Sequence, residues 1–295
     1  MHSTKAEAAV AGRGTAQRAR GALRLTSAAL GQALRVLKSE RTDGKAGVAG
    51  NLLRMKTKHL LKKIHPSWEF RAETICGRKV ECFSQYELMC TFEVVFVDRD
   101  YRFRATTPAP RILDCGSNIG LSVLWFKQEF PEARIVAFEP DPVTFALLHR
   151  NVRRNAVAGV ELHNLAVGGT PGLREFFHDP ANPASVCMSF TKQDAVPADE
   201  QVQVARLSQF VDGEVDFLKL DVEGAEVEVL EEVAGSGKLR RIREMVVEVH
   251  PGLAGGDTAL GRLRDILTSH RFEWEVRSGS SDDGGNFSIY AQRMQ

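Results

Sequence analysis

The chain has 295 residues, of which 43% are hydrophobic and 26% charged, and its formal net charge is +1. This composition is that of a globular protein, long enough for one large or two modest domains. The charge gives no whole-chain argument for a nucleic-acid partner, and no apolar run approaches the roughly 20 residues of a membrane helix. The five cysteines form no C-x-x-C pair, which indicates reduced thiols in a cytoplasmic protein.

The N-terminal segment differs in charge from the remainder of the chain. Its first 63 residues contain 14 lysines and arginines against 3 acids, so the other residues carry about ten net negative charges. Leucines recur in it at near-helical spacing, at positions 23, 30, 34 and 37. Three interpretations of residues 1–50 stay open: a solvated or flexible basic arm, a helical lid, or a segment that targets the protein or makes weak contact with a membrane surface.

Residues 51–108 are expected to form a helix and antiparallel strands on the substrate side of the main domain. Apolar residues on one face predict a helix over Leu52–Ile64, which Pro66 ends. Alternating, β-branched and aromatic residues predict strands within 74–83, 91–98 and 101–105. The sequence TTPAP then reads as a linker.

From residue 109 to the end, strand patterns alternate with helix patterns. Strands are expected at 111–116, 134–140, 160–167, 201–206, 215–223, 243–251, 272–276 and 287–293, and helices at 119–130, 142–155, 225–234 and 259–270. The alternation predicts an α/β domain whose mostly parallel sheet has helices on both faces. Ligands of such sheets bind at the carboxyl ends of the strands. The irregular residues 168–200, with His178, Met188 and Phe190, read equally as a substrate wall or as a surface loop.

The turn after the first of these strands, DCGSNIG, points to the class of ligand. Gly116 permits a sharp turn, and Gly120 lets the next helix start close to the strand or the ligand. A dinucleotide site would have G-x-G-x-x-G, but this turn has two glycines, and Asp114 would lie beside the phosphates. Asp114 and this turn therefore suit a positively charged nucleoside without phosphate, and S-adenosylmethionine is such a ligand.

The next two strand ends add residues that suit an adenosine. Glu139 follows the second strand about 20 residues after the glycine turn, where an acid can bind both ribose hydroxyls. His163 and Asn164 end the third strand, and either of them could face the adenine edge.

Ionisable residues also gather at the last two parallel strand ends. The sequence FLKLDVEGAE places Lys219, Asp221, Glu223 and Glu226 together, a crowding that is costly unless these charges are paired. Glu248 and His250 share one face of the following strand, and an imidazole there suits a general base. Oxygen ligands for a divalent ion are present, but no spacing demands one, so no metal is expected.

Together, ILDCGSNIG, AFEPDP, LHNLAVG, FLKLDVEGAEVEVL and VVEVH resemble the FkbM family of S-adenosylmethionine-dependent methyltransferases over about residues 111–295. The resemblance implies a class I, Rossmann-like fold with seven strands, the last antiparallel, and O-methylation of hydroxyls on polyketides, sugars and related metabolites. It implies that Asp114, Gly116, Ser117, Asn118, Gly120, Glu139, Asn164 and Asp221 bind the cofactor, and that Lys219, Glu223, Glu226, Glu248 and His250 line the methyl-transfer pocket.

The expected mechanism aligns an acceptor oxygen with the activated methyl group and removes one proton, which His250 or Asp221 takes. Two rivals remain: an adenosyl-binding module without activity that acts through its basic arm, and a nicotinamide-dependent oxidoreductase. The intact acid cluster argues against the first, and the two-glycine turn with Asp114 argues against the second. Neither the acceptor nor the oligomeric state follows from the sequence.

Overall fold

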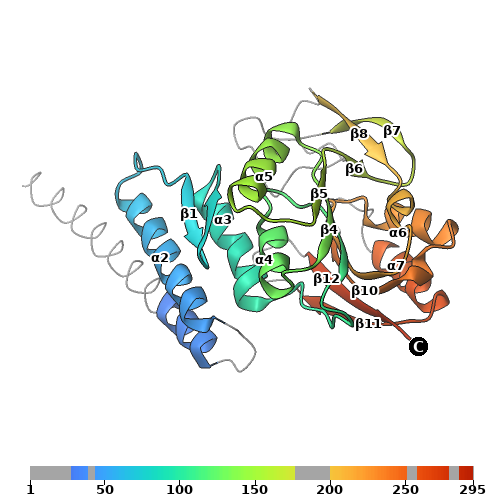
Figure 1. Cartoon of the computed structure of the whole chain (residues 1–295), viewed down its shortest axis with the longest axis horizontal. Helices are drawn as coiled ribbons and strands as arrows, with labels where there is room; N and C mark the ends of the chain where they lie inside the picture. Colours follow the sequence, from blue (N-terminus) through green and yellow to red (C-terminus); the bar gives the residue numbers. More distant parts are fainter. Residues whose placement is uncertain (1–27, 39–43, 177–199, 251–257, 279–285, 295) are drawn as a thin grey trace, which may run out of the picture. The chain divides into compact units, whose positions relative to one another are not determined.

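The computed structural model describes residues 28–38, 44–176, 200–250, 258–278 and 286–294 (Figure 1). The chain divides into two compact units, residues 1–98 and 99–295. His178, Met188 and Phe190 lie outside the described residues, so the interpretation of their segment as a substrate wall stays a prediction. Within the described ranges, no helix combines the length and the apolar character needed to cross a bilayer.

Two helical segments and a hairpin begin the first unit. Residues 28–38 are helical, and α2 (Lys45–Ile64) contains the predicted helix. Strands β1 (Ala72–Ile75) and β2 (Arg78–Glu81) pair antiparallel, as predicted for this stretch. Two further helical elements follow, α3 (Gln85–Phe92) and the π-helix η1 (Glu93–Asp98).

Two predicted strands of the N-terminal extension are wrong. Residues 91–98 are helical, because Ser84 caps α3 and the buried side chains of Leu88, Phe92 and Val95 recur with a helical period. Helical packing here overrides the β-propensity of the valines. Residues 101–105 are not a strand either, although Tyr101 and Phe103 point inward as the alternation indicated.

A seven-stranded sheet forms the centre of the second unit, as predicted. Its order is β11 (Phe272–Ser278), β12 (Phe287–Arg293), β10 (Ile242–Val249), β9 (Val215–Leu220), β3 (Arg111–Cys115), β4 (Arg134–Phe138) and β5 (Val160–His163). The last strand in the chain, β12, is antiparallel to both neighbours, and the pairs among β10, β9, β3, β4 and β5 are parallel. The carboxyl ends of these five strands therefore meet at one edge.

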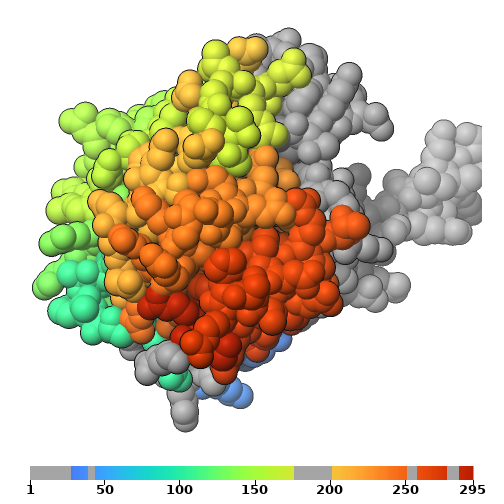
Figure 2. Space-filling view, turned by 90° about the vertical axis from the view of Figure 1, so that its right-hand side faces the viewer, coloured from blue at the N-terminus to red at the C-terminus, as the bar shows by residue number. Residues whose placement is uncertain are grey.

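Helices cover both faces of this sheet (Figure 1). Helices α4 (Leu121–Glu129) and α5 (Pro142–Arg154) lie on one face, and α6 (Glu226–Gly235) and α7 (Thr258–Ser269) on the other. Figure 2 shows the second face, where the orange α6 and α7 cover the sheet. The core beneath them joins apolar side chains of α6 and α7 to those of β3, β9 and β10.

A smaller sheet, in the order β6-β8-β7, lies outside the main one. The predicted third strand is interrupted after His163, the last residue of β5, and its continuation, β6 (Ala166–Val167), pairs with β8 (Glu200–Ala205) instead. The remaining strand, β7 (Gly172–Phe176), pairs antiparallel with β8, and the 3-10 helix η2 (Leu207–Phe210) follows β8 in the chain.

Candidate functional site

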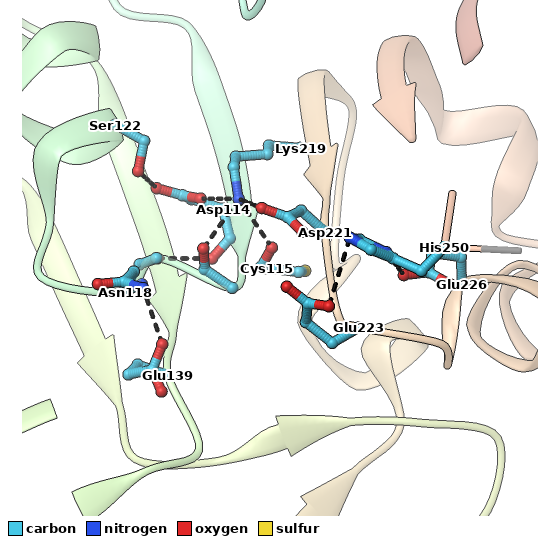
Figure 3. A network of polar contacts seen from close by, with 12 residues as sticks. Asp114, Cys115, Asn118, Ser122, Glu139, Lys219, Asp221, Glu223, Glu226 and His250 are labelled. Carbon is cyan, nitrogen blue, oxygen red and sulfur yellow. Dashed lines mark hydrogen bonds and ion pairs between the residues drawn. The ribbon is translucent and has the colours of Figure 1, made fainter. Parts of the chain in front are cut away.

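The predicted residues converge at the carboxyl edge of the large sheet (Figure 3). Asp114 is the penultimate residue of β3, and Lys219 lies opposite it in the register of the neighbouring β9. Side chains of residues paired in this way project from the same face of the sheet. Asp221 and Glu223 follow β9, and His250 follows β10, the next strand. The parallel topology thus brings together side chains that are far apart in the sequence.

Lys219 is the central cation of this cluster, and its side chain is 3% exposed. Its Nζ donates to the carbonyl oxygens of Gly116 at 2.8 Å and Cys115 at 3.3 Å, and to Asp221 Oδ2 at 3.0 Å. Asp114 Oδ1 lies 3.7 Å away. Burial alone would lower the pKa of Lys219, but the charges of Asp221 and Asp114 outweigh it and hold the pKa well above its usual value. Lys219 is therefore a permanent ammonium that joins the β3 turn to the β9 loop.

Two further residues enclose this ion pair. Ser122, from the first turn of α4, donates to Asp114 Oδ2 at 2.6 Å. The buried ring of Tyr101 lies 5.3 Å from Lys219 Nζ, within the range of a cation–π contact. The sequence interpretation missed Ser122, although its position in the first turn of the helix was a signal. Asp114 is itself fully buried, so here it supports the turn from beneath.

Close packing against other parts of the chain explains both glycines of the turn. Gly116 has a φ of 82°, and a Cβ there would lie 1.8 Å from the carbonyl oxygen of Asp221. Gly120 has a φ of 91°, and its Cβ would lie 2.6 Å from Leu148 Cδ1. Between them Asn118 adopts a φ of 47°, which is unusual outside glycine. The turn is therefore held in one shape by its neighbours, before any ligand is considered.

Glu139 lies at the end of β4 and is buried. It accepts hydrogen bonds from the backbone N–H of Asn118 at 2.9 Å and of Asp141 at 3.0 Å. Burial raises the pKa of Glu139 to about 8, although both N–H groups oppose the shift. Nearby, Asn164 Nδ2 donates to the carbonyl oxygens of Glu139 and Pro140. A carboxyl group that needs further hydrogen-bond donors thus lies beside the glycine turn.

Of the two candidates for the adenine edge, Asn164 is the one that bonds to the end of β4. His163 instead stacks on Phe138, with the ring centroids 5.3 Å apart, and its Nε2 lies 2.8 Å from Glu161 Oε1. Both contacts stabilise the end of β5.

His250 lies among three carboxylates. Its Nδ1 is 3.0 Å from Glu226 Oε1, and its Nε2 is 3.4 Å from Glu223 Oε2 and 4.0 Å from Asp221 Oδ1. Glu226 is fully buried and also accepts a hydrogen bond from the backbone N–H of Gly224. It therefore fixes the imidazole ring so that Nε2 faces the two more accessible acids.

The charges of this cluster work against His250 as a free base. Burial alone would lower the pKa of His250, but the hydrogen bond with Glu226 and the charges of Glu223 and Asp221 raise it to about 10. Burial also raises the pKa of Glu223, although the charge of His250 opposes the shift. At neutral pH the imidazole therefore carries its proton in this structure. Asp221, 23% exposed, is the most accessible of the acids that surround it.

Two other features complete the description of this edge of the sheet. Glu248 is half-buried on β10, and its charge acts on both Tyr101 and Glu223, which places it at the same edge. The ligand atoms of Asp221, Glu223 and His250 lie within 4.8 Å of one another, a spacing that could accommodate a cation. The expectation that the site uses no metal stays a prediction.

Comparison with known proteins identifies the family. Residues 114–274 match the family described as the methyltransferase FkbM domain. Methyltransferase sdnD of Sordaria araneosa is 31% identical over 197 residues, which cover 56% of this chain and 76% of that protein. The 31-O-demethyl-FK506 methyltransferase FkbM of Streptomyces tacrolimicus is 29% identical over 229 residues, which cover 66% of this chain and 86% of that protein.

A solved structure of a methyltransferase FkbM from Methylobacillus flagellatus aligns with 88% of this chain and 58% of its own, at a TM-score of 0.48 and 15% identity. The assignment rests on the sequence match, which spans more than half of the chain and includes the glycine turn, the β9 loop and His250. This protein therefore belongs to the FkbM family of methyltransferases, and its second unit has the class I methyltransferase fold.

Proposed function

We propose that the protein is an S-adenosylmethionine-dependent methyltransferase that methylates a hydroxyl group on a small molecule. The observation that carries the proposal is the set of acids at the carboxyl edge of the sheet, beside a turn with two glycines. Acids attract a cation and accept hydrogen bonds from hydroxyl and amino groups, whereas they repel the phosphates of a dinucleotide. This set of acidic hydrogen-bond acceptors supports S-adenosylmethionine and argues against a nicotinamide cofactor.

The residues present fit such a cofactor. Each carboxylate oxygen of Glu139 accepts one backbone hydrogen bond, and a carboxylate offers about four acceptor sites, so it can also accept from two ribose hydroxyls. Two such bonds would favour the charged form of a carboxyl group whose pKa burial has raised. Asn118 and Asn164 lie beside Glu139 and would border the ribose and the adenine, and Gly116 and Gly120 shape the turn beneath them.

The chain's own task in the reaction is to orient the acceptor and to remove its proton. The bound cofactor supplies an activated methyl group on a sulfonium. Asp221, held by Lys219 and partly exposed, can accept the proton of an incoming hydroxyl. The neighbouring carboxylates raise the pKa of His250, and its side chain is 6% exposed against 23% for Asp221, so of the two predicted bases we favour Asp221. Glu223 and Glu248 would border the acceptor, and Glu226 positions His250.

The class of acceptor is proposed from charge and from one relative. One relative is named for the O-demethyl compound on which it acts, 31-O-demethyl-FK506, a small molecule. The edge of the sheet contains more acids than cations, so a carboxylate or phosphorylated acceptor would meet repulsion, whereas a hydroxyl group would donate to Asp221 or Glu223.

Binding and transfer can be tested separately. S-adenosylhomocysteine at about 100 times its Kd should stabilise the protein by roughly 2.7 kcal/mol, or about 5 °C, and NAD(H) should not. Glu139→Gln should weaken this shift, and Glu132→Gln, which changes an exposed acid before β4, should leave it intact. A shift with NAD(H) alone would refute the cofactor assignment.

Transfer is measured as release of S-adenosylhomocysteine in the presence of hydroxylated polyketides and sugars, with matched carboxylic acids and amines for comparison. Turnover that requires the hydroxyl supports the proposal. Turnover restricted to acids or amines would refute the acceptor class. Cofactor binding together with salt-dependent RNA binding and no transfer to any acceptor would favour a binding module without activity.

A further inference from the structure

The short helix over residues 28–38 presents an apolar stripe to its surroundings. Ala29, Ala33 and Val36 are buried on one face, at 4% exposure or less. Leu30, Leu34 and Leu37 follow one another at spacings of four and three, so they share a second face, and each is 46–53% exposed. Gln32 of this helix donates from Nε2 to Glu93 Oε2 at 3.0 Å, a contact with its own unit, whereas the three leucines expose about half of their side chains.

Basic residues border this stripe. Lys38 lies one turn beyond Leu34, and Arg35 lies three residues before Lys38, so both flank the leucines on the side away from the buried face. The described helices 28–38 and α2 together contain eight lysines and arginines and no acid. A helix that exposes leucines beside cations has the character of a helix that lies in a membrane interface.

The far end of α2 repeats this combination. Lys62 and Lys63 are exposed in its last turn, and Ile64 and Trp68 are 60% and 45% exposed. Lys56 and Lys58 are paired with Glu93 and Glu73, whereas the part of the chain that the structure describes offers Lys62 and Lys63 no acidic partner.

The positive field of α2 is visible in a neighbouring group. Burial and the charges of Lys63, Lys56 and Lys62 lower the pKa of His59. A field that disfavours one more positive charge favours an anionic surface over a second copy of the same basic face.

We propose that the first unit docks on an anionic lipid bilayer, with Leu30, Leu34 and Leu37 inserted at the headgroup boundary and Arg35, Lys38, Lys62 and Lys63 against the lipid phosphates. The apolar stripe supplies burial, and the cations supply attraction, the two contributions that an interfacial helix needs. This inference concerns residues 28–98 and is independent of the proposed methyl transfer.

The test is sedimentation of the full chain with vesicles of phosphatidylcholine alone or with 30–40% phosphatidylglycerol (roughly the range in which surface charge dominates). Binding should require the anionic lipid and weaken with salt. Replacing Leu30, Leu34 and Leu37 together by alanine should reduce the partition coefficient by about fivefold for each leucine, and neutralising Lys62 and Lys63 to glutamine by about fivefold for each charge.

Matched controls come from the second unit. Leu173→Ala removes a leucine that is more exposed than any of the three, at 65%, and Arg240→Gln removes an exposed cation, and neither should change the partition coefficient. All replaced side chains are at the surface, so the variants should keep their circular dichroism. Three results would each overturn the proposal: no binding at low salt, equal losses in the controls, or a dimer by sedimentation equilibrium that the leucine variant abolishes.

Discussion

Replacing Lys219 by methionine is expected to destabilise the second unit by about 3–5 kcal/mol. The ammonium has four oxygen partners within 3.7 Å, and its removal leaves Asp114, fully buried, without a counter-charge. Removing one partner of a buried ion pair has a cost of this size because the remaining charge stays desolvated. Methionine has a similar volume, so little of the loss would come from packing.

A second substitution separates charge from packing. Asp114→Asn in the Lys219→Met background removes the stranded carboxylate, so the double variant should lose only about 1–2 kcal/mol, the value of the remaining hydrogen bonds. The double variant should therefore be more stable than Lys219→Met alone, by about 1–4 kcal/mol. Lys238→Met, which removes one hydrogen bond to the Ser208 carbonyl, serves as the control and should cost about 1 kcal/mol.

The assay is urea unfolding followed by tryptophan fluorescence in a Trp68→Phe background. This background removes the tryptophan of the first unit and leaves the buried Trp125 and the half-buried Trp274 to report on the second. A loss below about 1 kcal/mol in Lys219→Met, or a double variant no more stable than Lys219→Met alone, would refute the view that Lys219 neutralises Asp114.

Three further predictions concern the same edge of the sheet. Burial raises the pKa of Glu139 from 4.5 to about 8, so the native protein binds a proton that the unfolded chain releases. The free energy of unfolding should therefore fall as pH rises from about 4.5 to 8, by up to about 1.4 kcal/mol per pH unit. In urea titrations, the stability of Glu139→Gln should depend less steeply on pH, and a dependence parallel to that of the wild type would contradict this. Asp221→Asn should lower kcat by about 10²–10⁴. Extensive chelation should leave wild-type turnover unchanged. If Asp221→Asn, His250→Ala and the double variant all keep kcat within about threefold, neither Asp221 nor His250 is the base. Gly116→Ala should lower the free energy of unfolding by about 2–5 kcal/mol in thermal unfolding, because the added Cβ meets a backbone oxygen. Gly237→Ala is the control: Gly237 has a φ of 72° and open space around it, so the loss should be only about 1 kcal/mol. Equal losses would show that the clash does not matter.

The sequence predicts the architecture of the second unit because each of its parallel strands carries a local signal. Hydrophobic runs end in Asp114, Glu139 and Asp221, and a parallel sheet brings such ends to one edge whatever lies between them. The prediction for residues 91–98 was wrong because β-branched residues favour strands locally, while the helical burial of Val95 and Phe96 depends on tertiary packing.

Contacts within the site were less predictable than its membership. Nothing local to Gly116 indicates that the carbonyl of Asp221 fills the space of its missing side chain. The proton on His250 depends likewise on Glu223, in the loop after β9, and on Glu226, at the start of α6. Pairwise geometry of this kind requires the folded chain, because it depends on how two strand ends meet.

Glu223 combines two unfavourable features, a backbone φ of 53° and a carboxylate crowded by other acids. Glycine would relieve the first feature and remove the second, so selection for stability alone would replace this residue. An evolution experiment that rewards only thermal resistance should therefore enrich glycine at position 223. One that rewards methyl transfer should keep the glutamate, and the gap between the two outcomes would measure how much stability the protein gives up for its function.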